Sequence, residues 1–228
     1  MKSFISKIFR KFFPFRNEDI PSFLLHSLFH QGTFLPFTTS SLKFRSLACV
    51  CNDLVVNNRQ EYLEFGSGIS TIIVARLIKK NQLKTKITTV EEDLGWISII
   101  KKIIEDEGLE DLVTFIHAPT EKSEEIDNAF GYSASLVKTH FSQGNKFDCV
   151  LIDGPAAWEP HKKNSRICNA ILLNENLASN YSIFVDNANR PGELKLLDRL
   201  ATNAHVKPLH IDETFAVLIK GTHYNFII

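Results

Sequence analysis

The chain has 228 residues, 44% of them hydrophobic, and its 26 basic and 26 acidic side chains cancel to a formal net charge of zero. This length suits one α/β domain of ordinary size with an additional segment, and the apolar fraction is enough to fill its core. A neutral chain has no global attraction for nucleic acid, and the sequence has no run of about 18 apolar residues that could cross a bilayer. We therefore expect a soluble core and no nucleic-acid partner.

The first seventeen residues differ from the rest of the chain, because they hold five Lys or Arg side chains and no acid. Their apolar side chains recur at helical spacing and predict a basic amphipathic helix over residues 1–13 that Pro14 ends. The apolar positions are Phe4, Ile5, Ile8, Phe9, Phe12 and Phe13. Such a helix can pack on its own domain or on a second copy in a homodimer, or it can make peripheral contact with an anionic membrane. A secretory signal is not expected, because Arg10 and Lys11 interrupt the apolar stretch.

Residues 21–59 predict an extended arm followed by a helix. Gly32, Pro36 and the hydroxyl-rich run 38–41 punctuate the arm before a helical period begins at Leu42. We place the boundary of the chain's two parts here, with 1–45 as an N-terminal helix and arm and 46–228 as the main domain. We expect the arm to cover either the edge of a sheet or a ligand pocket.

Strands and helices alternate from residue 62 onward. The predicted strands cover residues 62–65, 87–90, 113–117, 147–153, 181–186, 205–209 and 215–220. One helix runs from the first glycine turn to about residue 81, a second covers 94–107 and a third begins at Pro191, while the polar stretch 119–145 gives no clear pattern. Strand, helix and strand in succession mean right-handed parallel crossovers, so the predicted fold class is α/β.

The stretch from Tyr62 to Thr71 reads as a buried strand that turns on two glycines into a helix. Gly66 and Gly68 let the backbone turn sharply and let a ligand approach without meeting a Cβ. The hydroxyl groups of Ser67, Ser70 and Thr71 can cap the donor-rich start of the helix. This geometry suits a nucleotide-like ligand, although a tight turn of this kind also occurs with no ligand at all.

Glu64, two residues before the first glycine, separates the candidate ligands. A carboxylate there would repel the pyrophosphate of a dinucleotide, and Thr71 replaces the third glycine of the dinucleotide motif. The carboxylate of Glu64 would attract S-adenosylmethionine, which carries an ammonium and a sulfonium group. The sequence Glu-Phe-Gly-Ser-Gly-Ile-Ser resembles the first motif of the class I methyltransferases that bind this cofactor. The cofactor-binding candidates in the stretch are Glu64, Gly66, Ser67, Gly68, Ser70 and Thr71.

Three further pieces resemble a little-characterised branch of the same superfamily, namely Phe34-Leu35-Pro36, Val90-Glu91 and Asp153-Gly154-Pro155. The resemblance covers the chain from about residue 33. It implies a Rossmann-like, seven-stranded methyltransferase sheet that is mostly parallel, with an antiparallel last strand inserted beside the fifth. It does not identify a methyl acceptor.

The resemblance also implies roles for residues at the strand ends. Glu91 matches the acidic residue that accepts hydrogen bonds from both ribose hydroxyls, with its neighbour Glu92 pointing away. His117 and Ala118 match the position beside the adenine. Asp153 matches a residue that faces the methionine end of the cofactor and the acceptor, which makes it a cofactor-binding and catalytic candidate.

Asp153 together with Asp186 and Asn187 resembles the metal site of catechol-type O-methyltransferases. Oxygen ligands of this kind suit Mg²⁺ or Ca²⁺, which would lower the pKa of an acceptor hydroxyl and orient it. The alternative interpretation is that Asp186 and Asn187 only form a turn or a helix cap before Pro191.

The general base is less clearly indicated. Catechol-type enzymes carry a lysine three residues after the first aspartate, where this sequence has Ala156. The base would then be His161 or Lys162, or the metal would act alone.

The four cysteines, Cys49, Cys51, Cys149 and Cys168, lack any C-x-x-C pairing. We expect buried free thiols in a reducing compartment, which indicates a cytoplasmic protein, at the inner membrane surface if the N-terminal helix contacts lipid.

The leading hypothesis is methyl transfer from S-adenosylmethionine to an oxygen or nitrogen of a small molecule or glycan. Two alternatives stay open. One is an NAD-dependent oxidoreductase, which Glu64 and Thr71 disfavour. The other is a non-catalytic, membrane-associated binding module, which the basic N-terminal helix and the missing lysine after Asp153 favour.

Overall fold

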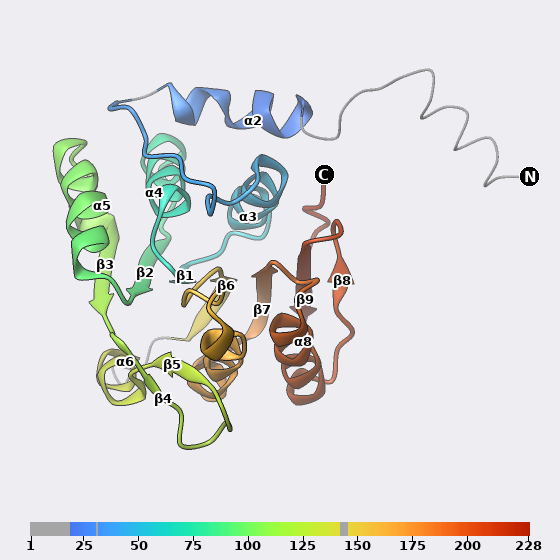
Figure 1. Cartoon of the computed structure of the whole chain (residues 1–228). Coiled ribbons are helices and arrows are strands. Elements are labelled where there is room, and N and C mark those ends of the chain that lie inside the picture. Colours follow the sequence, from blue (N-terminus) through green and yellow to red (C-terminus); the bar gives the residue numbers. More distant parts are fainter. Residues whose placement is uncertain (1–18, 31, 142–145) are drawn as a thin grey trace, which may run out of the picture.

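The computed structural model describes residues 19–30, 32–141 and 146–228, and its centre is a seven-stranded sheet between two layers of helices (Figure 1). The strand order is β3-β2-β1-β6-β7-β9-β8. The strands are β1 (Glu61–Phe65), β2 (Lys86–Glu91), β3 (Val113–His117), β6 (Phe147–Ile152), β7 (Leu177–Asp186), β8 (Leu209–His210) and β9 (Phe215–Lys220). The predicted α/β sheet is confirmed.

The first five strands of this sheet in chain order are parallel, and β9 is antiparallel to both of its neighbours, β7 and β8. The last strand is therefore inserted beside the fifth, as predicted. Phe65 at the end of β1 is in register with Val90 of β2 and Ile152 of β6. Because these strands run in the same direction, the residues that follow them meet at one edge of the sheet.

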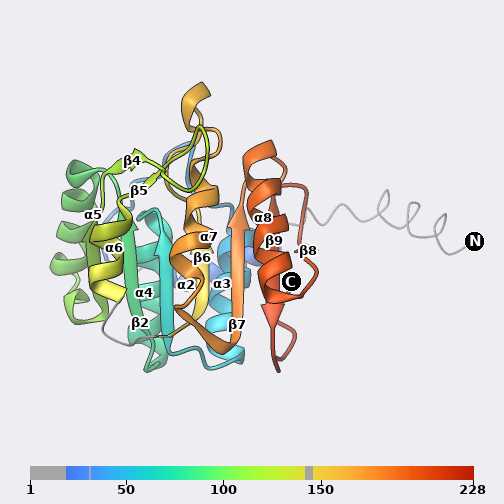
Figure 2. The ribbon, with the colours of Figure 1, turned by 90° about the horizontal axis from the view of Figure 1, so that it is seen from below.

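Helices cover both faces of the sheet (Figures 1 and 2). One face carries α3 (Phe44–Val56), α4 (Ile69–Asn81) and α5 (Leu94–Asp106), with α2 (Asp19–Phe29) packed over α3 and α4. The other face carries α6 (Ala134–Phe141), α7 (Asn169–Leu173) and α8 (Pro191–Ala204). Three short 3-10 turns are η1 (Glu110–Leu112), η2 (Pro160–Lys162) and η3 (Ser165–Cys168).

The alternation of side chains along β1 divides the core into two parts. Tyr62 packs with the helices α2 to α5, whereas Leu63 and Phe65 pack with α6 to α8 on the opposite face. Successive side chains of a strand point to opposite faces, so Glu64 lies on the same face as Tyr62, beneath α4. This placement decides what Glu64 can contact.

The described part of the arm packs into the core, and it is more helical than the sequence indicated. Residues 19–29 form α2, where an extended arm was expected from residue 21. Four leucines of the arm are almost completely buried, namely Leu25, Leu28, Leu35 and Leu42. The helix predicted over residues 1–13 lies outside the described residues, and the boundary between 45 and 46 stays a prediction.

Two other segments differ from the sequence-based expectation. The polar stretch 119–145 contains a small antiparallel hairpin, β4 (Thr120–Lys122) and β5 (Phe130–Tyr132), followed by α6. The strand expected from residue 205 begins only at Leu209, because His205, with φ 55°, forms the left-handed C-cap of α8.

The four cysteines are buried and free, as expected. None of the helices in the described ranges combines the length and the apolar character that crossing a bilayer requires.

Candidate active site

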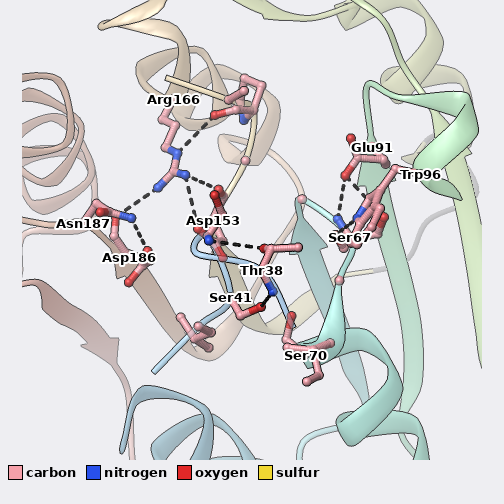
Figure 3. A pocket seen from close by; sticks show the side chains of 18 of the residues that line it. Thr38, Ser41, Ser67, Ser70, Glu91, Trp96, Asp153, Arg166, Asp186 and Asn187 are labelled. Carbon is pink, nitrogen blue, oxygen red and sulfur yellow. Dashed lines mark hydrogen bonds and ion pairs between the residues drawn. The ribbon is translucent and has the colours of Figure 1, made fainter. Parts of the chain in front are cut away.

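A cavity of about 650 Å³ opens at the carboxyl ends of β1, β2, β6 and β7 (Figure 3). Its walls include the turn 66–70, residues 91–93, residues 153–156, the pair 186–187 and the arm loop 38–43. A cavity of this size at the strand ends of an open α/β sheet is the usual position of a ligand site.

The turn after β1 is pressed against the loop after β6. Gly66 has φ +95°, and a Cβ there would lie 2.9 Å from the amide nitrogen of Gly154, so both conformation and contact require glycine. Gly68 has an extended backbone, and a Cβ there would meet only Ser70 Oγ, at 3.9 Å. Because Gly68 lines the cavity, its missing Cβ leaves that space to a ligand.

Glu64 does not reach the cavity. It is fully buried, the hydroxyl of Thr71 donates to its Oε2, and the hydroxyl of Tyr62 donates to Oε1 at 3.4 Å. Burial raises its pKa to about 7, against the opposing effect of hydrogen bonds from Ser70, Thr71 and Tyr62. The structure therefore places Glu64 behind the turn and outside the lining of the cavity, because the β1 alternation directs its side chain under α4. Its contact with a cofactor stays a prediction. Thr71 shares this buried position.

Glu91 ends β2 in the wall of the cavity and holds the glycine turn (Figure 3). Its Oε2 accepts hydrogen bonds from the amide of Ser67 at 2.9 Å and from the hydroxyl of Ser67 at 3.3 Å. Its Oε1 accepts from the amides of Glu92 at 2.8 Å and Asp93 at 3.0 Å. Burial raises the pKa of Glu91, and these hydrogen bonds oppose the rise. The indole of Trp96 donates to the carbonyl of Ser67 at 2.8 Å, which fixes the turn from the other side.

Glu92 also lines the cavity, which corrects the expectation that it points away. Its Oε1 accepts from the amide of Ala156 at 3.3 Å, and its Oε2 is buried without a hydrogen-bond partner among the described residues. Nearby, the ring of Tyr132 stacks on Phe65 with 5.9 Å between ring centroids, and its hydroxyl is likewise unpartnered within that part of the chain. Buried polar atoms of this kind beside a cavity mark places where a ligand or water can bind.

The end of β3 lies outside the lining of this cavity. His117 donates from Nε2 to the carbonyl of Glu92 at 3.2 Å, and the amide of the buried Ala118 donates to the carbonyl of Glu91 at 2.9 Å. The position of these two residues beside an adenine stays a prediction.

Asp153 follows β6, Asp186 is the last residue of β7, and the two carboxyl groups lie within hydrogen-bond distance of each other. Burial raises the pKa of both carboxyl groups, and the charge of Asp186 helps to raise that of Asp153 well above its usual range. Their hydrogen bond raises the pKa of Asp153 and lowers that of Asp186. Asn187 donates its side-chain amide to Asp186 Oδ2.

The positive charge beside this pair comes from Arg166, in η3 (Figure 3). Its Nη2 donates to the carbonyl of Asp153 and to Asp153 Oδ1 at 3.2 Å, and its Nη1 donates to the carbonyl of Asp186 at 3.1 Å. Its Nε donates to the carbonyl of Pro155 at 3.2 Å and lies 3.7 Å from Glu193 Oε1. One guanidinium group therefore ties the ends of two strands together. Sequence reasoning missed Arg166, because no motif marks it.

The side chains predicted to hold a divalent ion do not fit one in this arrangement. Asn187 uses its amide as a donor to Asp186, and the guanidinium of Arg166 already lies 3.2 Å from Asp153 Oδ1. An ion bound to Asp153 Oδ1 would therefore have to compete with the guanidinium of Arg166 for that oxygen. Within the described residues, no group of three or more His, Cys, Asp or Glu side chains could hold a metal ion.

The two predicted bases lie away from the described lining of the cavity. Both belong to η2 and both pair with Glu159, His161 through Nε2 at 3.5 Å and Lys162 through Nζ at 3.1 Å. The structure does not bring them to the acidic pair, and their catalytic role stays a prediction. Trp158, from the same loop, does line the cavity and is 70% exposed.

The arm loop 38–43 covers the cavity, which is one of the two positions that the sequence allowed. The amide of Thr38 donates to Ser41 Oγ at 2.9 Å, which closes the loop on itself. Lys43 donates from Nζ to Thr214 Oγ1 at 2.7 Å, which ties the arm to the turn before β9. These hydroxyl groups were not among the predicted site residues.

The sheet order, the reversed last strand and a cavity at the strand ends define the fold of the class I S-adenosylmethionine-dependent methyltransferases. No protein-family model matches the chain, and no curated protein matches its sequence.

Three solved structures illustrate this similarity. The O-methyltransferase TomG from Streptomyces achromogenes, in complex with S-adenosylmethionine, has a TM-score of 0.57 and 12% identity, over 90% of this chain and 99% of that chain. The O-methyltransferase from Bacillus cereus, in complex with S-adenosylhomocysteine, has a TM-score of 0.56 and 16% identity, over 91% and 93% of the two chains. A methyltransferase from Geobacter sulfurreducens has a TM-score of 0.55 and 13% identity, over 96% of each chain.

Proposed function

We propose that the chain is a methyltransferase that carries a methyl group from S-adenosylmethionine to an oxygen or nitrogen of a small molecule or a glycan. The proposal rests on the position of Glu91. This buried carboxylate at the end of β2 accepts hydrogen bonds from the glycine turn in the wall of a large cavity. The fold supports the same cofactor, because two similar proteins were solved with S-adenosylmethionine or S-adenosylhomocysteine.

The hydrogen bonds of Glu91 indicate how a ribose would enter. A carboxylate has about four acceptor positions, and four protein donors fill them here. The longest of these bonds, at 3.3 Å, comes from the flexible hydroxyl of Ser67. A ribose hydroxyl would replace that hydroxyl without disturbing the three amide donors, and the open space at Gly68 would take the adjoining part of the ligand.

The other end of the cavity would receive the methyl acceptor. S-adenosylmethionine supplies an electrophilic methyl group on a sulfonium. The ionised carboxylate of the pair Asp153 and Asp186 would accept a hydrogen bond from an acceptor hydroxyl or amine and take the one proton that the acceptor loses on methylation. The loop 38–43 and Trp158 would limit the access of water and hold the acceptor in line, so the protein contributes mainly position.

A thermal-shift screen tests the proposal. S-adenosylmethionine and S-adenosylhomocysteine are each expected to raise the melting temperature, with NAD causing no shift. Glu91→Ala should remove the shift, whereas Glu105→Ala, on the exposed face of α5, should keep it. A shift with NAD alone would support an oxidoreductase instead. Binding of S-adenosylhomocysteine without methyl transfer to any acceptor in a broad panel would support the non-catalytic module.

A further inference from the structure

We propose that Arg166 is the resident cation of the acceptor end, in the place where an enzyme of the catechol type would hold a divalent ion. Methyl transfer by this chain would then need no metal, a consequence that rests on the proposed function. The assignment of the cation itself rests only on the contacts of Arg166.

Arg166 joins the ends of two neighbouring strands. Arg166 is 6% exposed, and its guanidinium spans the gap between the end of β6 and the end of β7 (Figure 3). It contacts the carbonyl of Asp153, the carboxyl oxygen of Asp153 and the carbonyl of Asp186 at once. A metal ion shared by the two carboxyl groups would need Asp153 Oδ1 as a ligand, and Arg166 Nη2 already contacts that oxygen at 3.2 Å.

Further charged groups lie around Arg166. Glu193, 1% exposed, lies 3.7 Å from Arg166 Nε and 2.9 Å from Arg190 Nη2. Two guanidinium groups thus face three carboxyl groups at this end of the cavity. A divalent ion added to this cluster would lie against two fixed positive charges, which is the reverse of the oxygen-only surroundings that Mg²⁺ and Ca²⁺ prefer.

Most hydrogen-bond donors of Arg166 are used within the protein. Its donors point to the carbonyl oxygens of Asp153, Pro155 and Asp186 and to the Asp153 carboxyl group. Few donors are left for a substrate, so Arg166 is a positioning residue that holds the acidic pair in place. An arginine suits this task because its planar fork stays charged when buried.

Manganese alone is the probe for this proposal. Chelator-treated full-length protein is titrated with Mn²⁺ by calorimetry, before and after saturation with S-adenosylhomocysteine. The unmodified chain is expected to show no stoichiometric binding tighter than about 1 mM. Arg166→Met removes the charge at similar length and should create a Mn²⁺ site at least roughly tenfold tighter, which Asp186→Asn in the same chain should abolish. Arg199→Met, on α8, is the matched control and should bind no Mn²⁺.

The outcomes separate the two proposals. One Mn²⁺ bound by the unmodified chain and lost in Asp186→Asn would overturn the role of Arg166, whatever the S-adenosylhomocysteine result. A chain that binds neither ligand would overturn the proposed function and leave the role of Arg166 standing. If Arg166→Met does not fold, the unmodified chain and Asp186→Asn still test the role of Arg166. Absence of Mn²⁺ binding by the unmodified chain supports that role, and binding that Asp186→Asn removes overturns it.

A separate observation concerns the outer face of α2. Leu25 and Leu28 face the core, but Ile20, Phe23 and Leu24 on the other side are 59%, 81% and 53% exposed. α2 lies on the outside of the helical layer formed by α3 and α4 (Figure 1). Three large apolar side chains on one short exposed helix face are unusual unless they contact something.

The chain's composition identifies the kind of surface. The eighteen residues that precede this helix carry five Lys or Arg and one acid, Glu18, within a chain of zero net charge. We infer that the exposed face of α2 inserts into an anionic membrane surface, because apolar side chains beside concentrated positive charge are what such a surface binds. A second copy of the same chain would bring like charges together.

Vesicle sedimentation tests this inference with the full chain. Vesicles of phosphatidylcholine with about 30% phosphatidylserine should sediment the protein, and phosphatidylcholine alone should not. Phe23→Ser with Leu24→Ser should cut sedimentation several-fold without changing the melting temperature. Ile99→Ser, at an apolar residue of α5 that is 49% exposed, should leave sedimentation unchanged. Unchanged sedimentation of the double variant would overturn the inference. So would light scattering that shows a dimer of the unmodified chain and a monomer of the double variant.

Discussion

The two ends of the cavity are built in different ways. The proposed cofactor end is formed by one continuous turn, 66–70, and the carboxylate of Glu91, and backbone amides supply three of the four donors to that carboxylate. The acceptor end is assembled from side chains of separate elements, with Arg166 of η3 joining Asp153 after β6 to Asp186 in β7. The first end is therefore determined mainly by local backbone geometry, and the second by the placement of distant side chains.

The largest expected effect separates the two glycines of the turn. Gly66→Ala should lower the free energy of unfolding by about 2–5 kcal/mol, because a left-handed residue with a Cβ costs roughly 1–2 kcal/mol and the tight contact with Gly154 adds roughly 1–3 kcal/mol. Gly68→Ala should change it by less than about 1 kcal/mol yet weaken S-adenosylhomocysteine binding. Urea unfolding and calorimetry measure the two effects, and equal losses of stability would show that the backbone account of the turn is wrong.

The next effect compares the two ends directly. Glu91→Ala should weaken S-adenosylhomocysteine binding by about 1.5–3 kcal/mol, as expected for hydrogen bonds to a charged group. Asp186→Asn should leave this affinity within about twofold, because the substitution lies at the other end of the cavity. If calorimetry shows that both variants lose binding together, the cofactor and acceptor ends have been assigned wrongly.

A smaller effect concerns pH and Glu64. Its pKa is raised to about 7 in the folded chain, above the ordinary value, so the folded state binds this proton more tightly than the unfolded state. The stabilising contribution is complete below the unfolded pKa and is lost as pH rises toward 7. Glu64→Gln should remove this loss. The free energy of unfolding of the variant, minus that of the unmodified chain, should therefore rise by about 2 kcal/mol from pH 5 to pH 8. Parallel stability curves for the two proteins would contradict the buried position of Glu64.

The smallest effect concerns Trp96. Trp96 lines the cavity and its indole donates to the carbonyl of Ser67, so Trp96→Phe removes one neutral hydrogen bond to the turn. We expect S-adenosylhomocysteine affinity to fall by about 1 kcal/mol, with the Mn²⁺ response unchanged. A larger loss than that of Glu91→Ala would mean that the indole itself contacts the ligand.

Much of the fold could be predicted from the sequence because its signals are local. The Glu64–Thr71 stretch, the β-branched strand before Glu91 and the apolar strand before Asp153 each have the period and punctuation of their element. The strand order then followed from the resemblance. The α2 helix and the β4–β5 hairpin were missed because tertiary packing, on α3 and on the loop after β6, decides their structure more than their own pattern does.

The site was predictable only in part, for the same physical reason. Strand ends converge, so Glu91, Asp153 and Asp186 could be expected in one cavity. The burial of Glu64 depends on which face of β1 the helix α4 covers, and Glu92 turns inward to accept the amide of Ala156. Arg166 follows Asp153 by thirteen residues through a loop with no periodic pattern, so neither spacing nor composition shows that it lies beside the acidic pair.

The most direct measurement is a crystal structure of the chain grown with S-adenosylhomocysteine and Mn²⁺. The account predicts ribose hydroxyls on the carboxylate of Glu91, the sulfur facing Asp153, and the guanidinium of Arg166 still between Asp153 and Asp186, with no ion there. A ribose bound away from Glu91 would contradict the cofactor end. A manganese ion between the two aspartates, with Arg166 displaced, would contradict the acceptor end.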